Sequence, residues 1–237
     1  MASVMTAGGS AGRRSGFERF RGSLLYDAAT RLPLVVWFAL CGLTMGERLL
    51  SDIAAAPAID FALALDIVAR SSAILFVSLV ILVLTFRRPA VARAPGLLPR
   101  LVAFGGTFSV TALALFPLVP HSLAISAASL VLMCVGYGFA CYSVLHLGRS
   151  LSMMAEARKL VTTGPYAIVR HPLYAAEAIA SLGMLLQYLS APAIALWVAH
   201  IGLQCWRMAY EERVLRQTFP EYGAYAARVA RLVPGLH

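Results

Sequence analysis

Long apolar runs separated by short arginine-bearing loops limit this chain to a small set of folds. The runs lie near 32–50, 67–86, 101–119, 122–145, 172–189 and 192–210. Each is close to the roughly 20 residues that a helix needs to cross a bilayer. Only 13% of the residues are charged, whereas soluble domains carry about 25%. The sequence therefore predicts an all-α integral membrane protein with about six transmembrane helices.

The distribution of basic residues predicts the orientation of these helices. Arginine and lysine gather in four segments: 1–31, 87–100, 146–171 and 207–237. The alternate ends of the helices are acidic or nearly uncharged. An even number of spans with both termini in the cytoplasm satisfies the positive-inside rule at every loop. We therefore expect a partly disordered basic tail over 1–31, transmembrane helices over 32–145, and a polar segment and C-terminus that meet on the cytoplasmic side.

Two other features exclude common functions. The net charge of +9 follows the membrane-topology pattern and lacks the aromatic-interleaved basic patch of a nucleic-acid binder. The cysteines Cys41, Cys134, Cys141 and Cys205 all lie inside apolar runs without a CxxC motif. The sequence therefore predicts neither a nucleic-acid partner nor a metal site.

A polar, turn-forming stretch between the fourth and fifth runs is the first candidate site. Gly164 and Pro165 signal a turn, and Pro172 suits the first turn of the next helix. His171 is then expected just outside the helix N-terminus with its ring free to meet a ligand. The unpaired N–H groups there would suit a carboxylate. Alternatively, Arg170 and His171 only anchor the helix at the headgroup level.

Acidic residues near the last two apolar runs are the second candidate. Arg207 and Glu211 are four apart and share a helix face, so together they suit a ligand with both charges. Glu212 follows directly. Glu177 lies inside the fifth run, where an ionisable side chain marks a functional site by default. A structural pairing with an arginine remains open for Glu177, although Arg70 is expected at the opposite membrane face.

The C-terminal segment 219–228 is amphipathic and aromatic. Tyr222 and Tyr225 are three apart, which places them on one face of a helix. We expect a short cytoplasmic helix that folds back on the bundle. An interfacial helix without a ligand is the alternative.

Together these motifs resemble the isoprenylcysteine carboxyl methyltransferase family and its phospholipid methyltransferase relatives, over roughly residues 146–234. The resemblance rests on Leu160–Tyr166, Arg170–Tyr174, the Glu211–Glu212 pair and the Phe219, Tyr222, Tyr225 pattern. It implies S-adenosylmethionine as cofactor, in a cytoplasmic pocket formed by the loop before helix five and the C-terminal helices. It makes 146–237 the catalytic region.

Residue roles follow from the resemblance by position. Arg207 falls on a substrate-side arginine, and Arg170 is a catalytic neighbour. Glu211 or Glu212 would meet the positive charge of the cofactor, and Glu177 is a further candidate. The cofactor-binding set implied by position is Arg158, Lys159, Leu160, Val161, Tyr166, His171, Pro172, Leu173, Tyr174 and Glu211. Glu177 and Glu212 are added to it as cofactor-binding candidates because of their charge and their place in the chain.

The methyl acceptor stays open at this point. A lipophilic or prenylated carboxylate is favoured by the resemblance, and it needs no general base. A phospholipid amine or a small thiol would have to lose a proton, and no dedicated base is obvious. A non-catalytic lipid-binding or scaffold protein is the alternative from another class, and a transporter is a third possibility.

Overall fold

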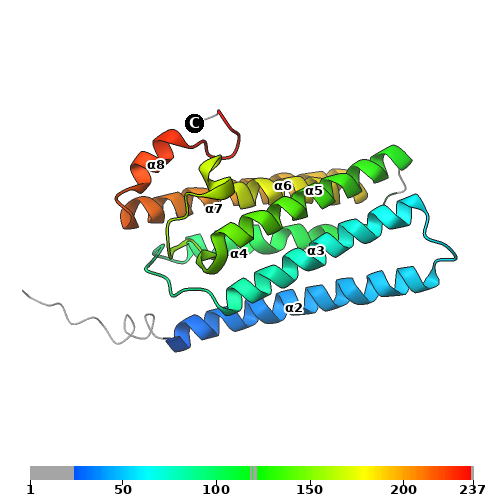
Figure 1. Ribbon diagram of the computed structural model, residues 1–237, viewed down its shortest axis with the longest axis horizontal. Helices are drawn as coiled ribbons and strands as arrows, with labels where there is room; N and C mark the ends of the chain where they lie inside the picture. Colours follow the sequence, from blue (N-terminus) through cyan, green and yellow to red (C-terminus); the bar gives the residue numbers. More distant parts are fainter. Residues whose placement is uncertain (1–23, 118, 120–121, 236–237) are drawn as a thin grey trace, which may run out of the picture.

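The computed structural model describes residues 24–117, 119 and 122–235, and these form a bundle of helices (Figure 1). Most of the basic tail predicted for 1–31 lies outside the described residues. The elements are α2 (Leu24–Ala55), α3 (Phe61–Thr85), β1 (Ala92–Arg93), α4 (Leu98–Phe108), η1 (Ser109–Leu115), α5 (Leu123–Leu147), η2 (Gly148–Ser150), β2 (Glu156–Ala157), η3 (Gly164–Ala167), α6 (Pro172–Gln187), α7 (Ala191–Thr218) and α8 (Tyr222–Arg228).

The long helices pack around a shared interior. α2 packs against α3, α3 against α5, α5 against α6, and α7 against both α6 and α4. Trp37 on α2 meets Phe108 on α4 edge to face, with ring centroids 5.2 Å apart. The two helices at the ends of this series of contacts, α2 and α4, therefore also touch. Figure 1 shows the start of α2, the loops that follow α3 and α5, and α8 at one end of the bundle. The residues predicted to be functional are therefore gathered at that end.

Three helices are long and apolar enough to cross a membrane, by length and composition: Arg31–Ala55, Leu63–Thr85 and Leu123–Ser150. They overlap the first, second and fourth predicted spans, and the protein is an integral membrane protein. The other three predicted spans correspond to helices that do not meet this criterion. α6 has 16 residues, which at about 1.5 Å per residue is shorter than a hydrocarbon core of about 30 Å.

Several boundaries differ from those expected. α2 extends beyond both ends of 32–50. α3 begins before residue 67 because Asp60 caps it, accepting a hydrogen bond from the Leu63 backbone N–H at 2.8 Å. The all-α prediction also missed an antiparallel pair in which Ala92 and Arg93 face Ala157 and Glu156. This pair joins the loop after α3 to the segment before α6.

Two glycines allow α5 and α6 to approach closely. A Cβ added at Gly136 would lie 2.4 Å from the Ala180 nitrogen, and one at Gly183 would lie 2.7 Å from the Ser129 carbonyl oxygen. The Ser129 hydroxyl donates to the Gly183 carbonyl at 2.7 Å. This crossing packs the C-terminal half of α6 against α5, while the predicted site residues of this helix lie in its N-terminal half.

Candidate active site

A cavity of about 890 Å³, open mouth included, lies where the 147–174 segment meets α7 and α8. We call it the loop-side cavity. Most of the residues predicted from the sequence line it, and they are Arg158, Lys159, Leu160, Val161, Tyr166, Arg170, His171, Leu173, Tyr174, Glu177, Arg207 and Glu211. Pro172 and Glu212 are not among its lining residues. The tertiary structure thus brings together two motifs that lie far apart in the sequence.

Glu211 is held at the cavity wall by two neighbours. The Tyr174 hydroxyl donates a hydrogen bond to Glu211 Oε1. Arg207 Nε lies 3.4 Å from the same oxygen, which confirms that the two residues share a helix face. The Arg207 guanidinium also lies over the Tyr174 ring, 5.2 Å from its centroid. This arrangement fixes a carboxylate and a guanidinium side by side in one cavity.

Glu212 has a different role, because two arginines and a histidine surround its carboxylate. His171 Nε2 lies 3.0 Å from Glu212 Oε1, Arg170 Nε 3.2 Å and Arg231 Nε 3.3 Å. Burial opposes ionisation of this carboxyl, but the hydrogen bond from His171 and the charges around it outweigh burial and lower its pKa. Glu212 therefore fastens three segments together.

The same contacts correct the expectation for His171. The residue does lie just outside the start of α6, at the N-cap position, but its ring is only 5% exposed and Nε2 is engaged with Glu212. The ring is therefore not free, although it borders the cavity. Arg170 is also occupied, because its Nη1 donates to the Ala226 carbonyl at 2.5 Å. Both side chains join α6 to the C-terminal region.

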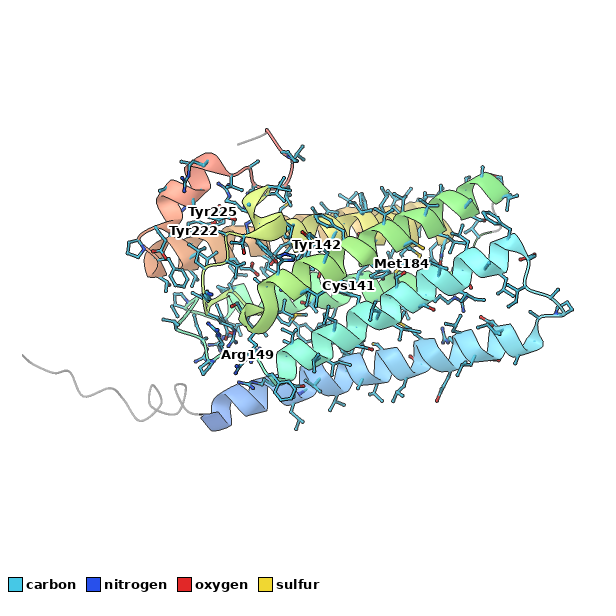
Figure 2. All side chains as sticks on the ribbon, viewed as in Figure 1. Cys141, Tyr142, Arg149, Met184, Tyr222 and Tyr225 are labelled. Carbon is cyan, nitrogen blue, oxygen red and sulfur yellow. The ribbon has the colours of Figure 1, made fainter. Side chains whose placement is uncertain are left out.

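The C-terminal helix α8 folds back on the bundle as predicted, and Figure 2 shows Tyr222 and Tyr225 close to the loop that precedes α6. The Tyr225 hydroxyl donates to the Tyr166 carbonyl at 2.6 Å, and the Arg170 N–H donates to the Ala230 carbonyl at 2.8 Å. Burial raises the pKa of Tyr225 to about 12, so its hydroxyl stays a donor at neutral pH. The C-terminal segment thereby closes one side of the cavity.

Sequence reasoning missed the segment before Arg158, and it did not include Tyr222 and Tyr225 among the residues that line the site. Ser152, Met153 and Glu156 line the loop-side cavity, although they carry no recognisable motif. Glu156 Oε2 lies 2.5 Å from Arg158 Nη2, and Glu156 Oε1 lies 3.0 Å from Arg93 Nε. The only sequence signal was Glu156 as a lone acid among basic residues. This signal does not identify the distant Arg93 as its partner.

A second cavity of about 1210 Å³, open mouth included, lies inside the bundle, and we call it the bundle cavity. Its walls are mainly apolar side chains from α2 to α7, such as Trp37, Phe76 and Met184. It shares part of its wall with the loop-side cavity, namely Leu151, Met153, Leu173, Glu177 and Arg207. Charged groups thus stand where a polar cavity adjoins an apolar one.

Glu177 is at this boundary and accepts a hydrogen bond from Gln204 Nε2 at 2.9 Å. Arg70 does not serve as its partner, because it pairs with Asp52 at 2.6 Å and with Asp66 at 2.9 Å. Arg70 and Asp66 lie in the first half of α3 and Asp52 lies near the end of α2, which agrees with the expectation that Arg70 lies at the opposite face. Arg70 therefore does not explain Glu177, and the side chain of Glu177 borders both cavities.

Comparison with known proteins places this chain among methyltransferases. The profile of the phospholipid methyltransferase family matches residues 123–222. The chain is 35% identical to protein-S-isoprenylcysteine O-methyltransferase B of Arabidopsis thaliana over 128 residues, which cover 50% of this chain and 64% of that protein. It is 34% identical to protein-S-isoprenylcysteine O-methyltransferase A of the same plant over 134 residues, 53% of this chain and 67% of that protein.

A further relative carries a different name. The nickel-cobalt-cadmium resistance protein NccN of Alcaligenes xylosoxydans xylosoxydans is 35% identical over 83 residues, which cover 34% of this chain and 38% of that protein. The matches therefore include plant isoprenylcysteine methyltransferases and a bacterial protein named for metal resistance.

Proposed function

Because the chain belongs to the isoprenylcysteine carboxyl methyltransferase family, we propose that it is a membrane-embedded methyltransferase that uses S-adenosylmethionine. The acceptor is a lipophilic molecule, and a carboxylate of the isoprenylcysteine type is the first candidate. The single observation that carries the proposal is the boundary shared by the polar and apolar cavities. A water-soluble donor and a lipid-soluble acceptor can meet only at such a boundary.

The residues of the loop-side cavity fit the cofactor by their chemistry. S-adenosylmethionine carries a sulfonium, an ammonium and a carboxylate, and when bound it supplies an electrophilic methyl group. Glu211 offers a fixed anion, while Lys159 offers a cation. The rings of Tyr166 and Tyr222 supply flat surfaces for the adenine. Burial also raises the pKa of both phenols, so neither adds negative charge.

The bundle cavity suits the acceptor chain. It is bounded by helices that lie within the membrane, and its wall is predominantly apolar. An acceptor whose chain fills this cavity places its polar end at the boundary where Arg207 stands. Arg207 is 6% exposed, so its charge acts in a poorly screened environment.

Arg207 has the geometry of a positioning cation. Its Nη1 and Nη2 lie 3.3 Å from Thr107 Oγ1 and from the Ser152 carbonyl, and Glu211 holds Nε. These contacts fix the guanidinium so that it can orient a carboxylate toward the donor cavity. With the methyl donor held near Glu211 and Lys159, its methyl group would pass to the carboxylate oxygen that Arg207 orients, and the electrons of the carbon–sulfur bond would stay on sulfur. No proton moves, so the enzyme contributes alignment and exclusion of water.

We extend the proposal to the topology. Six membrane-crossing segments with both termini in the cytoplasm agree with the arginine pattern of the loops. The loop-side cavity would then open to the cytoplasm, where the soluble cofactor is available. Because α6 is shorter than the hydrocarbon core, either the bilayer or the helices next to α6 must adapt to its length.

The test separates donor binding from acceptor binding. S-adenosylhomocysteine is titrated into detergent-purified protein by calorimetry, and methyl transfer to N-acetyl-S-farnesylcysteine is then measured. A Met184→Trp variant fills the bundle cavity, inside the bundle and away from Tyr222 and Tyr225 (Figure 2). It should retain calorimetric binding and lose transfer. The Leu145→Trp control changes a side chain that is 64% exposed and should retain both, whereas failure of the wild type to bind would refute the proposal.

A further inference from the structure

We infer that the acceptor carries a primary ammonium beside its anionic group, and that Glu177 and Gln204 bind this ammonium with His200 nearby. The inference rests on the proposed function and deepens it by naming the chemistry of the acceptor headgroup. It gives Glu177 a role toward the acceptor, whereas the sequence had suggested a role toward the cofactor because an ionisable residue lies inside an apolar run.

The face of α7 that borders the bundle cavity is unusually polar. His200, Gln204 and Arg207 follow one another at spacings of four and three residues, so they share this face. Gln204 is 6% exposed and His200 is 2% exposed. A polar stripe buried inside an apolar cavity is costly unless a ligand or a partner completes its hydrogen bonds.

Two atoms of this stripe lack such a partner. Among the described residues, Gln204 Oε1 and His200 Nε2 are buried without a hydrogen-bond partner. Gln204 uses its Nε2 to donate to Glu177, and His200 Nδ1 lies 2.8 Å from the Ser109 hydroxyl. The remaining atoms are therefore left for a molecule that enters the cavity.

Gly106 makes room for the Gln204 side chain. A Cβ added at Gly106 would lie 2.8 Å from Gln204 Oε1, so even alanine would crowd this oxygen. The amide orientation follows from Glu177, because the carboxylate requires a donor to face it. Gln204 thus keeps an acceptor available at the cavity wall.

The unfilled groups define the complementary ligand. A carboxylate at Glu177 and a carbonyl oxygen at Gln204 both accept, so the ligand must donate, and a positive charge is favoured beside the anion. An ammonium meets both requirements. Arg207, less than one turn beyond Gln204, is placed for an anion of the same headgroup. The site therefore fits a zwitterionic amphiphile better than a simple fatty carboxylate.

The location of these groups argues for the acceptor over the cofactor as their ligand. Glu177 and Arg207 border both cavities, but Gln204 and His200 line only the bundle cavity. A cofactor ammonium in the loop-side cavity would meet Glu177 without meeting Gln204. The combined contact is available only from the membrane side.

The experiment compares two probes that differ only at the amino group, S-farnesylcysteine and N-acetyl-S-farnesylcysteine. Transfer from radiolabelled S-adenosylmethionine is measured as kcat/KM for each. We expect the wild type to favour the free amine by about 10-fold, the scale of one charge-assisted hydrogen bond. The Glu177→Gln variant should lose this preference and keep its calorimetric affinity for S-adenosylhomocysteine. Gln204→Leu should weaken the preference in the same direction.

A third probe distinguishes the sources of the ammonium, because phosphatidylethanolamine vesicles offer it without a carboxylate. With the two cysteine probes, a base-labile product is a methyl ester, which forms at the carboxylate oxygen without proton transfer. A base-stable product is an N-methylamine. In that reaction nitrogen first loses a proton, which Glu177 accepts, and then forms its bond to carbon as the carbon–sulfur bond breaks. Either product with an amine preference supports the inference.

Two outcomes would overturn it while leaving the proposed function intact. One is equal or better transfer to the N-acetyl probe by the wild type. The other is a Glu177→Gln variant that loses affinity for S-adenosylhomocysteine and keeps its acceptor preference, because Glu177 would then serve the cofactor. Absence of both calorimetric binding and transfer would instead count against the proposed function itself.

Discussion

Replacement of Glu211 by glutamine should weaken cofactor binding, whereas the same change at Glu212 should weaken the fold. The two residues are adjacent in sequence, yet only Glu211 lines the loop-side cavity. Its side chain is 19% exposed, so its charge is poorly screened. Glu212 faces away, toward His171 and the arginines that hold the C-terminal segment.

The expected magnitudes follow from these contacts. A hydrogen bond to a charged group contributes about 1.5–3 kcal/mol, so Glu211→Gln should raise the dissociation constant by about 10- to 100-fold. Arg207 keeps its contacts to Thr107 and Ser152, which limits damage to the fold. Glu212→Gln should lower stability by about 1–3 kcal/mol, since it leaves the largely buried Arg170 and the partly buried Arg231 without their anion.

The assay pairs calorimetric titration of S-adenosylhomocysteine with thermal unfolding in the same detergent. Cys141→Ala is the control, because this buried side chain on α5 (Figure 2) lies outside both cavities. The reasoning is refuted if Glu212→Gln weakens binding as much as Glu211→Gln while its thermal midpoint stays that of the wild type. Equal binding by Glu211→Gln and Cys141→Ala would likewise remove Glu211 from the cofactor site.

Three further predictions concern the frame around the site. Gly136→Ala should destabilise the protein by about 1–3 kcal/mol, because the new Cβ would lie 2.4 Å from an α6 backbone nitrogen. Gly138→Ala is the control, because a Cβ there meets nothing within 4 Å. Equal thermal midpoints for the two variants would contradict the predicted destabilisation. Tyr225→Phe should cost about 1 kcal/mol by removing the 2.6 Å hydrogen bond to the Tyr166 carbonyl, a loss visible as a lower midpoint. The pKa of Glu212 is lower in the folded protein, since His171 and nearby charges overcome the opposing effect of burial; its contribution is therefore present at neutral pH and lost as pH falls below about 4.5. Midpoints measured from pH 6 to pH 3 should fall less steeply for Glu212→Gln than for the wild type.

Much of the functional region could be predicted because its signals are local. The turn at Gly164, the helix that starts at Pro172 and the pairing of Arg207 with Glu211 each depend on residues within a few positions. Local sequence also indicated the short C-terminal helix. The family resemblance rests on the same motifs, and the comparisons confirm it.

The parts that could not be predicted depend on contacts between distant segments. The β pair joins Arg93 to Glu156, and nothing near either residue specifies the other. The free ring expected at His171 was wrong because its partner Glu212 comes from α7, 41 residues later. The polar stripe on α7 also becomes part of a cavity wall only when α2 to α6 pack around it.

Sequence by itself determined that this chain enters a membrane and which residue types its site contains. Hydrophobicity and loop charge act on each segment separately, so they can be read without knowing the fold. Only the tertiary structure decided which of two adjacent glutamates lines the loop-side cavity, and that Glu177 borders both cavities. Those outcomes depend on how the helices pack and which side chains meet. The burial of a side chain is set by the residues that surround it in the folded protein, and many of these are distant in the sequence.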